Sequence, residues 1–341
     1  MGNYLFSLNG IKVLALLAIF WWHSSAPNPY LDLRARGCDL LFVISGYLTM
    51  HNYRGIHCCS DYVRYLNKKI SKVYPLYIIC ILLVIILMPE TVPFNIWGLK
   101  KFIVNILMLQ GWTDITSING PTWFISVLMG LYFISPIICN YILRLEKYYK
   151  PIFAMVVIAR IIAELCNGSI YSISMHSNGC IRLLDYIIGM LYCIGNKGVI
   201  CHLSNVLYKT SVEIVFILCT IGIYLYFQNT NFRFIIILWD GIFVCLFARS
   251  HGGYISRFLS NEILFKFANI QMEFYILHQV AILLGYIIFK HFFGDINGYI
   301  LMILTFFLLL TISYFYKTFF ESKLNLILSS IILRLEMKKN V

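Results

Sequence analysis

Long apolar runs, separated by short polar segments, follow one another along the whole chain. An α-helix needs about 20 predominantly apolar residues to cross the hydrocarbon core of a bilayer. No polar stretch large enough for a soluble domain interrupts the runs. The pattern predicts an all-α protein, a polytopic transmembrane helical bundle that forms one domain over residues 1–341. We distinguish eleven apolar segments, at residues 4–23, 38–52, 73–89, 98–112, 122–143, 151–166, 180–195, 211–227, 233–248, 270–290 and 299–317.

The Lys and Arg residues indicate which of these segments span the membrane. Segment 98–112 is the weakest, because it contains Lys100, Lys101, Asn105 and Gln110. If it does not span and the N-terminus is cytoplasmic, most of the 27 basic residues lie in cytoplasmic segments, as the positive-inside rule requires. We therefore expect about ten spans, both termini in the cytoplasm, and a re-entrant or interfacial helix at 98–112.

Composition narrows the class of protein further. Hydrophobic residues make up 60% of the chain and charged residues only 12%, which excludes an ordinary soluble domain. The net charge of +12 would suit nucleic-acid binding, but the basic residues are not clustered as such a surface requires. The eleven cysteines are scattered without a CxxC spacing, so no metal site is expected. Membrane lipid is the expected surrounding, and nucleic acid is not an expected partner.

Two ionisable residues share the first apolar segment. Lys12 and His23 are eleven positions apart, which on an α-helix is three turns plus roughly 20°, or about 16 Å along the axis. They therefore lie on one face of the predicted helix. Ionisable groups at membrane depth are costly and by default mark a functional site. The alternatives are a lysine that extends to the interface and a histidine that merely ends the helix.

Six segments taken together resemble the acyltransferase 3 family, integral-membrane enzymes that transfer acyl groups to hydroxyls of bacterial surface carbohydrates. Each match alone is weak, but all six occur in the family's order. The family's arginines are replaced by lysines at three positions, and Leu128 stands where the family often has a glutamate. The segments are LNGIKVLALLAIFWWH (8–23), RGCDLLFVISGYL (36–48), YLNKKISKVYPLY (65–77), PTWFISVLMGLYFISP (121–136), FYILHQV (274–280) and YKTFFESKL (316–324).

The resemblance implies catalytic roles for His23, Asp39 and Lys12. His23 would take the proton from an acceptor hydroxyl, because the pKa of an imidazole lies near working pH. Asp39 would hold the His23 tautomer; the alternative is an acid at the start of a helix. Lys12 would pair with the donor's phosphates or stabilise the oxyanion.

The resemblance also implies a donor site at the cytoplasmic mouth. Arg64, Lys68, Lys69 and Lys72 would bind the phosphates of a coenzyme A headgroup, although the positive-inside rule alone explains their number. No bound cofactor is expected, since acyl-CoA, with acetyl-CoA favoured, acts as a co-substrate.

Further candidates line the substrate path or pack the bundle. Ser45, Trp123, Ser126, Tyr275 and His278 are assigned to the substrate channel, with side-chain packing as the alternative reading. For His278 the default is a structural histidine hydrogen-bonded across helices, and a second catalytic or shuttle role is the alternative.

The remaining intramembrane charges admit two readings. Glu321 is expected to pair with a Lys or Arg, and Arg160 with Glu164, four positions along one helix. Asp185 and Asp240 would either face an acceptor cavity or pair with arginines, for which Arg182 and Arg233 are available.

The sequence thus predicts a membrane O-acyltransferase, favoured as an O-acetyltransferase, of the bacterial inner membrane. It would move an acyl group from cytoplasmic acyl-CoA to a sugar hydroxyl of a surface polysaccharide or lipid-linked glycan. Two alternatives stay open: a transporter or flippase of a lipid-linked glycan, and a transmembrane acyl carrier that serves a separate enzyme.

Overall fold

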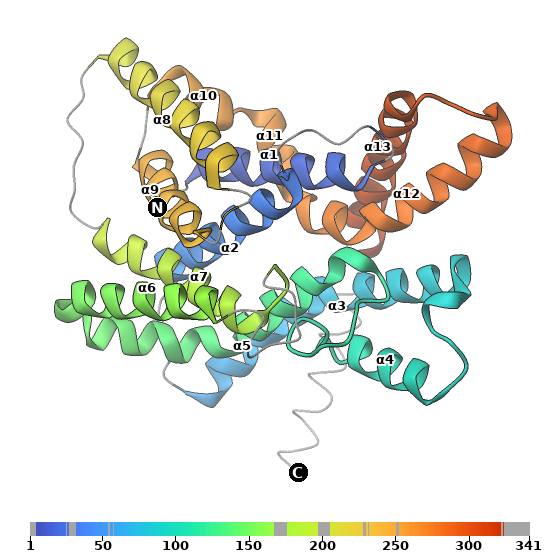
Figure 1. Cartoon of the computed structure of the whole chain (residues 1–341), viewed down its shortest axis with the longest axis horizontal. Coiled ribbons are helices and arrows are strands. Elements are labelled where there is room, and N and C mark those ends of the chain that lie inside the picture. Colours follow the sequence, from blue (N-terminus) through green and yellow to red (C-terminus); the bar gives the residue numbers. More distant parts are fainter. Residues whose placement is uncertain are drawn as a thin grey trace.

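The computed structural model is all-α, as the apolar pattern predicts. It describes residues 5–24, 26, 32–53, 55–56, 58–166, 176–196, 205–227, 230, 232–249, 252–321 and 323. In Figure 1, α1 and α2 occupy the centre, α6 and α7 lie on the left, and α12 and α13 on the right. The described residues form thirteen α-helices: α1 (Phe6–His23), α2 (Leu33–Asn52), α3 (Cys59–Leu87), α4 (Ile96–Ile106), α5 (Trp123–Arg144), α6 (Tyr149–Leu165), α7 (Gly179–Gly195), α8 (Val206–Phe227), α9 (Phe234–Arg249), α10 (Tyr254–Leu259), α11 (Glu262–Asn269), α12 (Gln271–Phe293) and α13 (Gly298–Phe315).

Six of the described helices are long and apolar enough to cross a bilayer: α1, α3, α5, α8, α12 and α13. This confirms a polytopic helical membrane protein. The other predicted spans correspond to α2, which carries several charged residues, and to α6, α7 and α9, which have 17, 17 and 16 residues. Helix α4 has 11 residues and is about 16 Å long, roughly half the thickness of the hydrocarbon core. Its length agrees with the reading of segment 98–112 as a helix that does not span.

Helices α2 and α7 approach each other backbone to backbone. A Cβ atom added to Gly46 would lie 1.9 Å from the carbonyl oxygen of Tyr186, and one added to Gly189 would lie 2.1 Å from that of Val43. Glycines at both crossing points thus permit a contact that no larger residue allows, as is common where membrane helices pack. This close contact fixes α2, which carries candidate residues along its length, against α7.

The connection between α4 and α5 folds back onto the bundle. The hydroxyl of Ser126 in α5 donates to the carbonyl of Met108 at 2.6 Å and accepts from the amide of Gly111 at 3.0 Å. The Gln110 amide donates to the hydroxyl of Tyr77 in α3 at 2.8 Å. The two bonds of Ser126 satisfy backbone groups that would otherwise be buried without partners. The connection therefore packs against α3 and α5, and its last residues, 119–122, reach α12.

Candidate active site

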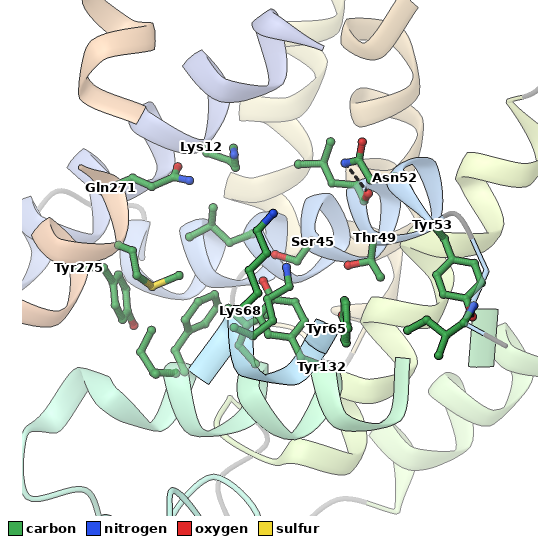
Figure 2. Close-up of a pocket in the computed structure, with 18 of the residues that line it drawn as sticks. Lys12, Ser45, Thr49, Asn52, Tyr53, Tyr65, Lys68, Tyr132, Gln271 and Tyr275 are labelled. Atoms are coloured by element: carbon green, nitrogen blue, oxygen red, sulfur yellow. Dashed lines mark hydrogen bonds between the residues drawn. The ribbon is translucent and has the colours of Figure 1, made fainter. Parts of the chain in front are cut away.

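A cavity of about 670 Å³ lies between α1, α2, α3, α5 and α12. Figure 2 shows it as an elongated space with Tyr275 at one end and Tyr53 at the other. Its walls are mainly apolar, with a few polar and basic groups. Among the predicted site residues, the cavity brings together Lys12, Ser45, Arg64, Lys68, Lys69 and Tyr275.

Basic side chains from α1 and α3 line this cavity. The Lys69 ammonium lies over the Tyr132 ring, 4.2 Å from its centroid, a cation–π contact. Lys72 does not line the cavity, but its charge acts repulsively on both Lys12 and Lys69. The described residues include no carboxylate in an ion pair with Lys12, Lys69 or Lys72, and Arg64 has only a long contact of 3.9 Å with Asp61. Cations held together in this way favour an anionic ligand.

Tyr275 closes the end of the cavity opposite Tyr53. Its hydroxyl donates to the carbonyl of Pro121 at 3.0 Å, and its ring packs against Phe124 with centroids 5.1 Å apart. Leu128, at the position where a glutamate was expected by resemblance, is also part of the wall. This end also carries the Gln271 amide (Figure 2), and no carboxylate side chain stands at position 128.

Two histidines lie beyond Tyr275. The rings of His23, at the end of α1, and His278, in α12, have centroids 5.3 Å apart. His278 is only 1% exposed, and its ring centroid is 5.3 Å from that of Tyr275. The walls of the cavity include neither histidine. Tyr275 therefore stands between the cavity and the histidine pair.

The tautomer of His278 follows from its hydrogen bond. Nδ1 lies 2.5 Å from the carbonyl oxygen of Tyr275, and a carbonyl oxygen only accepts hydrogen bonds. Nδ1 must therefore carry the proton, which in a neutral ring leaves Nε2 with a lone pair. Nε2 is buried and has no hydrogen-bond partner among the described residues. An imidazole held in this way is equipped to accept a proton.

Besides His278, two residues assigned to the channel lie outside this cavity. Ser126 is fully buried and is engaged by the backbone of the α4–α5 connection. Trp123 packs edge-on against His176, with ring centroids 4.6 Å apart. The two residues share a face of α5, as their spacing indicates. These hydrogen bonds and this ring contact join them to the α4–α5 connection and to His176 rather than to the cavity. Their assignment to the channel stays a prediction.

Asp39 lies within α2 and is bound by arginines. Its carboxylate is 2.6 Å from Arg182, 2.9 Å from Arg36 and 3.7 Å from Arg233. The alternative reading as an acid at the start of the helix is wrong, because α2 begins at Leu33 and its N-cap is Asp32. Both oxygens of the Asp39 carboxylate are thus engaged by guanidinium groups, while its orienting role toward His23 stays a prediction.

The arginines around Asp39 belong to a larger buried ionic network. Arg182 also binds Asp185 at 2.8 Å, and Arg160 binds both Asp185, at 2.8 Å, and Glu164, at 2.6 Å. This confirms the expected pairing of Arg160 with Glu164 and one of the two readings of Asp185. Asp240 instead accepts a hydrogen bond from the hydroxyl of Tyr224. The network joins α2, α6 and α7 and excludes Asp185 from a free acceptor cavity.

A second ionic cluster connects α12 to the end of the helix that follows it. Lys317 binds Glu321 and also Glu273, the latter at 3.1 Å. The expected pairing of Glu321 with a basic residue is therefore confirmed. Within the part of the chain that the structure describes, no group of three or more His, Cys, Asp or Glu residues is arranged to hold a metal ion.

The structure is that of a polytopic helical membrane protein in which a cavity lined by several basic side chains adjoins two histidines. Comparison with protein families gives a match to the acyltransferase domain of the acyltransferase 3 type over residues 5–318. The match covers nearly the whole chain, and the chain belongs to this family. It is therefore an acyltransferase, a transferase that acts on acyl groups, which favours the enzyme over the transporter reading. No curated protein and no solved structure matches the chain significantly.

Proposed function

We propose that the protein transfers an acetyl or other short acyl group from cytoplasmic acyl-CoA to a hydroxyl of a surface or lipid-linked glycan. The observation that supports this most directly is the cavity whose lysines have no described carboxylate partner and whose far end adjoins two histidines. We place the enzyme in the bacterial inner membrane, with the basic side of the cavity toward the cytoplasm, as the positive-inside rule favours.

The donor headgroup binds at the basic side of the cavity. Coenzyme A carries several phosphate groups, which lysine and arginine side chains bind by charge-assisted hydrogen bonds. Arg64, whose side chain is 82% exposed, meets the headgroup first, with Lys68 and Lys69 deeper on the same helix. Lys72 adds a positive charge beside them. Tyr65 and Tyr132, which flank Lys69, supply aromatic faces for the planar part of the donor.

Lys12 acts on the donor rather than on the reacting carbonyl. It lies about 16 Å along α1 from His23, too far for one side chain to contact the carbonyl carbon while the other contacts the acceptor hydroxyl. Its ammonium instead binds a phosphate or a carbonyl of the donor's pantetheine arm. The apolar walls next to it, among them Leu16 and Leu128, exclude water from the thioester as it passes toward Tyr275.

Chemistry takes place at the histidine pair. His23 receives the proton of the acceptor hydroxyl as the hydroxyl oxygen attacks the thioester carbonyl. Because Tyr275 separates the cavity from the histidines, its side chain must move aside for the thioester to reach them. Ser45 lines the cavity wall on α2 and offers a hydroxyl to the donor's amide groups.

The proposed function is tested with purified protein in liposomes and labelled acetyl-CoA. The expected result is label transferred to the hydroxyls of an added surface glycan or lipid-linked oligosaccharide, with release of CoA thiol. Label that stays bound to the protein alone would favour the acyl-carrier alternative. Absence of both transfer and thiol release with every short acyl-CoA would contradict the proposal.

Replacement of Lys69 by alanine is expected to raise KM for acyl-CoA by about 10- to 100-fold and to leave kcat nearly unchanged. The lysine contributes to ground-state binding of donor phosphate, and a charge-assisted hydrogen bond is worth roughly 1.5–3 kcal/mol. Initial rates at varied acyl-CoA and varied salt measure the effect, which should shrink as salt screens the charge. Lys266→Ala is the matched control, since Lys266 is exposed and paired with Glu262. An unchanged KM for the Lys69 variant would remove this residue from the donor site.

A further inference from the structure

The proposed reaction has to move a proton as well as an acyl group. The acceptor hydroxyl loses its proton, and the thiolate that leaves the donor gains one. His23 is placed to receive the first proton, and once Tyr275 has moved aside the sulfur lies with the thioester carbonyl at the histidine pair. A second proton carrier beside His23, on the side from which the donor enters, would bring the proton to the sulfur.

His278 is the residue that stands in this position. Its ring contacts the ring of His23 on one side and that of Tyr275, which lines the cavity, on the other, with centroids 5.3 Å apart in both cases. The bond from Nδ1 to the Tyr275 carbonyl fixes the ring and leaves Nε2 as a buried acceptor with no described partner. Burying an unused acceptor is costly, which favours a role for Nε2 beyond packing.

We propose that His278 is a second catalytic base, which takes a proton from His23 and delivers it to the leaving thiolate. This rests on the proposed function. In the step, the bond between the hydroxyl oxygen and the carbonyl carbon forms and the carbon–sulfur bond breaks. The hydroxyl proton moves to one ring nitrogen of His23, and the proton on the other nitrogen moves to Nε2 of His278. The His278 imidazolium then protonates the thiolate, which gives CoA thiol and returns His278 to its neutral form.

The groups around His278 suit this role. From α1 it faces His23, and on its own helix it faces Tyr275, whose hydroxyl also interacts with Cys38 of α2. The described contacts of His278 include no carboxylate. An acid beside the ring would hold the proton on Nε2 and stop its onward transfer, whereas a second imidazole can both take up and release a proton.

The variant His278→Asn separates this role from a structural one. Its amide can donate to the Tyr275 carbonyl as Nδ1 does, but it cannot take up a proton. We expect kcat to fall about 10²-fold, KM for acyl-CoA to change less than twofold, and thermal stability in detergent to stay close to that of the unaltered protein. His278→Gln is the second variant, and His291→Asn, exposed near the end of the same helix, is the control.

A proton inventory measures how kcat depends on deuterium fraction, which a purely structural role of His278 would not change. In mixtures of H₂O and D₂O, the unaltered protein should show a curved dependence of kcat on deuterium fraction, because two protons move in the limiting step. The His278 variants should show a linear dependence, because one proton remains. A variant that keeps its full rate and the curved dependence would overturn the proposal, as would a loss of rate matched by an equal loss of donor binding.

The same measurements are made on the slow hydrolysis of acyl-CoA without a glycan. The thiolate needs a proton in that reaction too, so the His278 variants should lose hydrolysis as well. If the protein hydrolyses acyl-CoA but labels no glycan, the proposed function fails while the effect of His278 is still measured. If the glycan is labelled and the variants act like the unaltered protein, the proton role fails and the function stands.

Discussion

Replacement of His23 by alanine is expected to lower kcat for acyl transfer by about 10³- to 10⁴-fold. A positioned proton acceptor contributes roughly 10²- to 10⁴-fold to such reactions, and loss of His23 also removes the proton path to His278. The helix should remain in place, because the residues that anchor α1 in the bundle, among them Leu16 and Ile19, are unaffected. Rates of glycan acylation from labelled acetyl-CoA, with the amount of inserted protein measured in parallel, provide the test.

The matched control for this variant is His291→Ala. His291 is an exposed histidine at the end of α12 and packs against Phe292, so its loss should leave the rate within about twofold. The double variant of His23 and His278 should be hardly slower than the His23 variant alone, because residues that act as a unit are not additive. A normally inserted His23→Ala protein that acylates glycan at the full rate would end the assignment of His23 as the proton acceptor.

The fold could be predicted because apolar runs of this length can form few stable structures in a bilayer. The recurrence of the runs fixed the class of protein, and the polar interruptions at Asn105 and Gln110 marked the helix that does not span. The structure shows why these two residues are present: Asn105 binds the backbone of the α4–α5 connection, and Gln110 binds Tyr77. What length alone could not reveal is that α6 and α7 stay short, with ionic side chains buried among them.

The candidate site was only partly predictable, because some of its residues lie far apart along the chain and meet only in the folded protein. Lys12 and Lys69 were found because each lies in a local pattern, and the structure places both on one cavity. The pair of His23 with His278, and that of Asp39 with Arg182, join helices that no spacing rule connects. A carboxylate near the start of the second apolar segment looks like a partner for His23, and only the tertiary structure shows that arginines engage both of its oxygens.

Replacement of Arg182 by methionine is expected to lower the free energy of unfolding by a large amount. The Arg182 guanidinium is 2% exposed and donates to Asp39, to Asp185 and to the carbonyl of His176 at 2.6, 2.8 and 2.9 Å. Methionine fills much of the volume but donates nothing, so three buried acceptors each lose a partner, at about 1–3 kcal/mol apiece. Removing one partner of a buried ion pair typically costs about 3–5 kcal/mol, which is a large part of a typical folding free energy of 5–15 kcal/mol. We therefore expect little folded protein, and a clearly lower Tm for what remains.

Thermal unfolding in detergent, followed by fluorescence and by size-exclusion chromatography, measures this loss. Arg257→Met is the control, because Arg257 is exposed and lies over the ring of Tyr254, and its Tm should not change. Arg182→Lys should recover only part of the stability, because an ammonium lacks the planar fork that serves several acceptors at once. A Tm within measurement error for Arg182→Met would mean that the remaining contacts of Asp39 with Arg36 and of Asp185 with Arg160 suffice. The network would then be a set of independent pairs, and α2 and α7 would be held together by their glycine contacts instead.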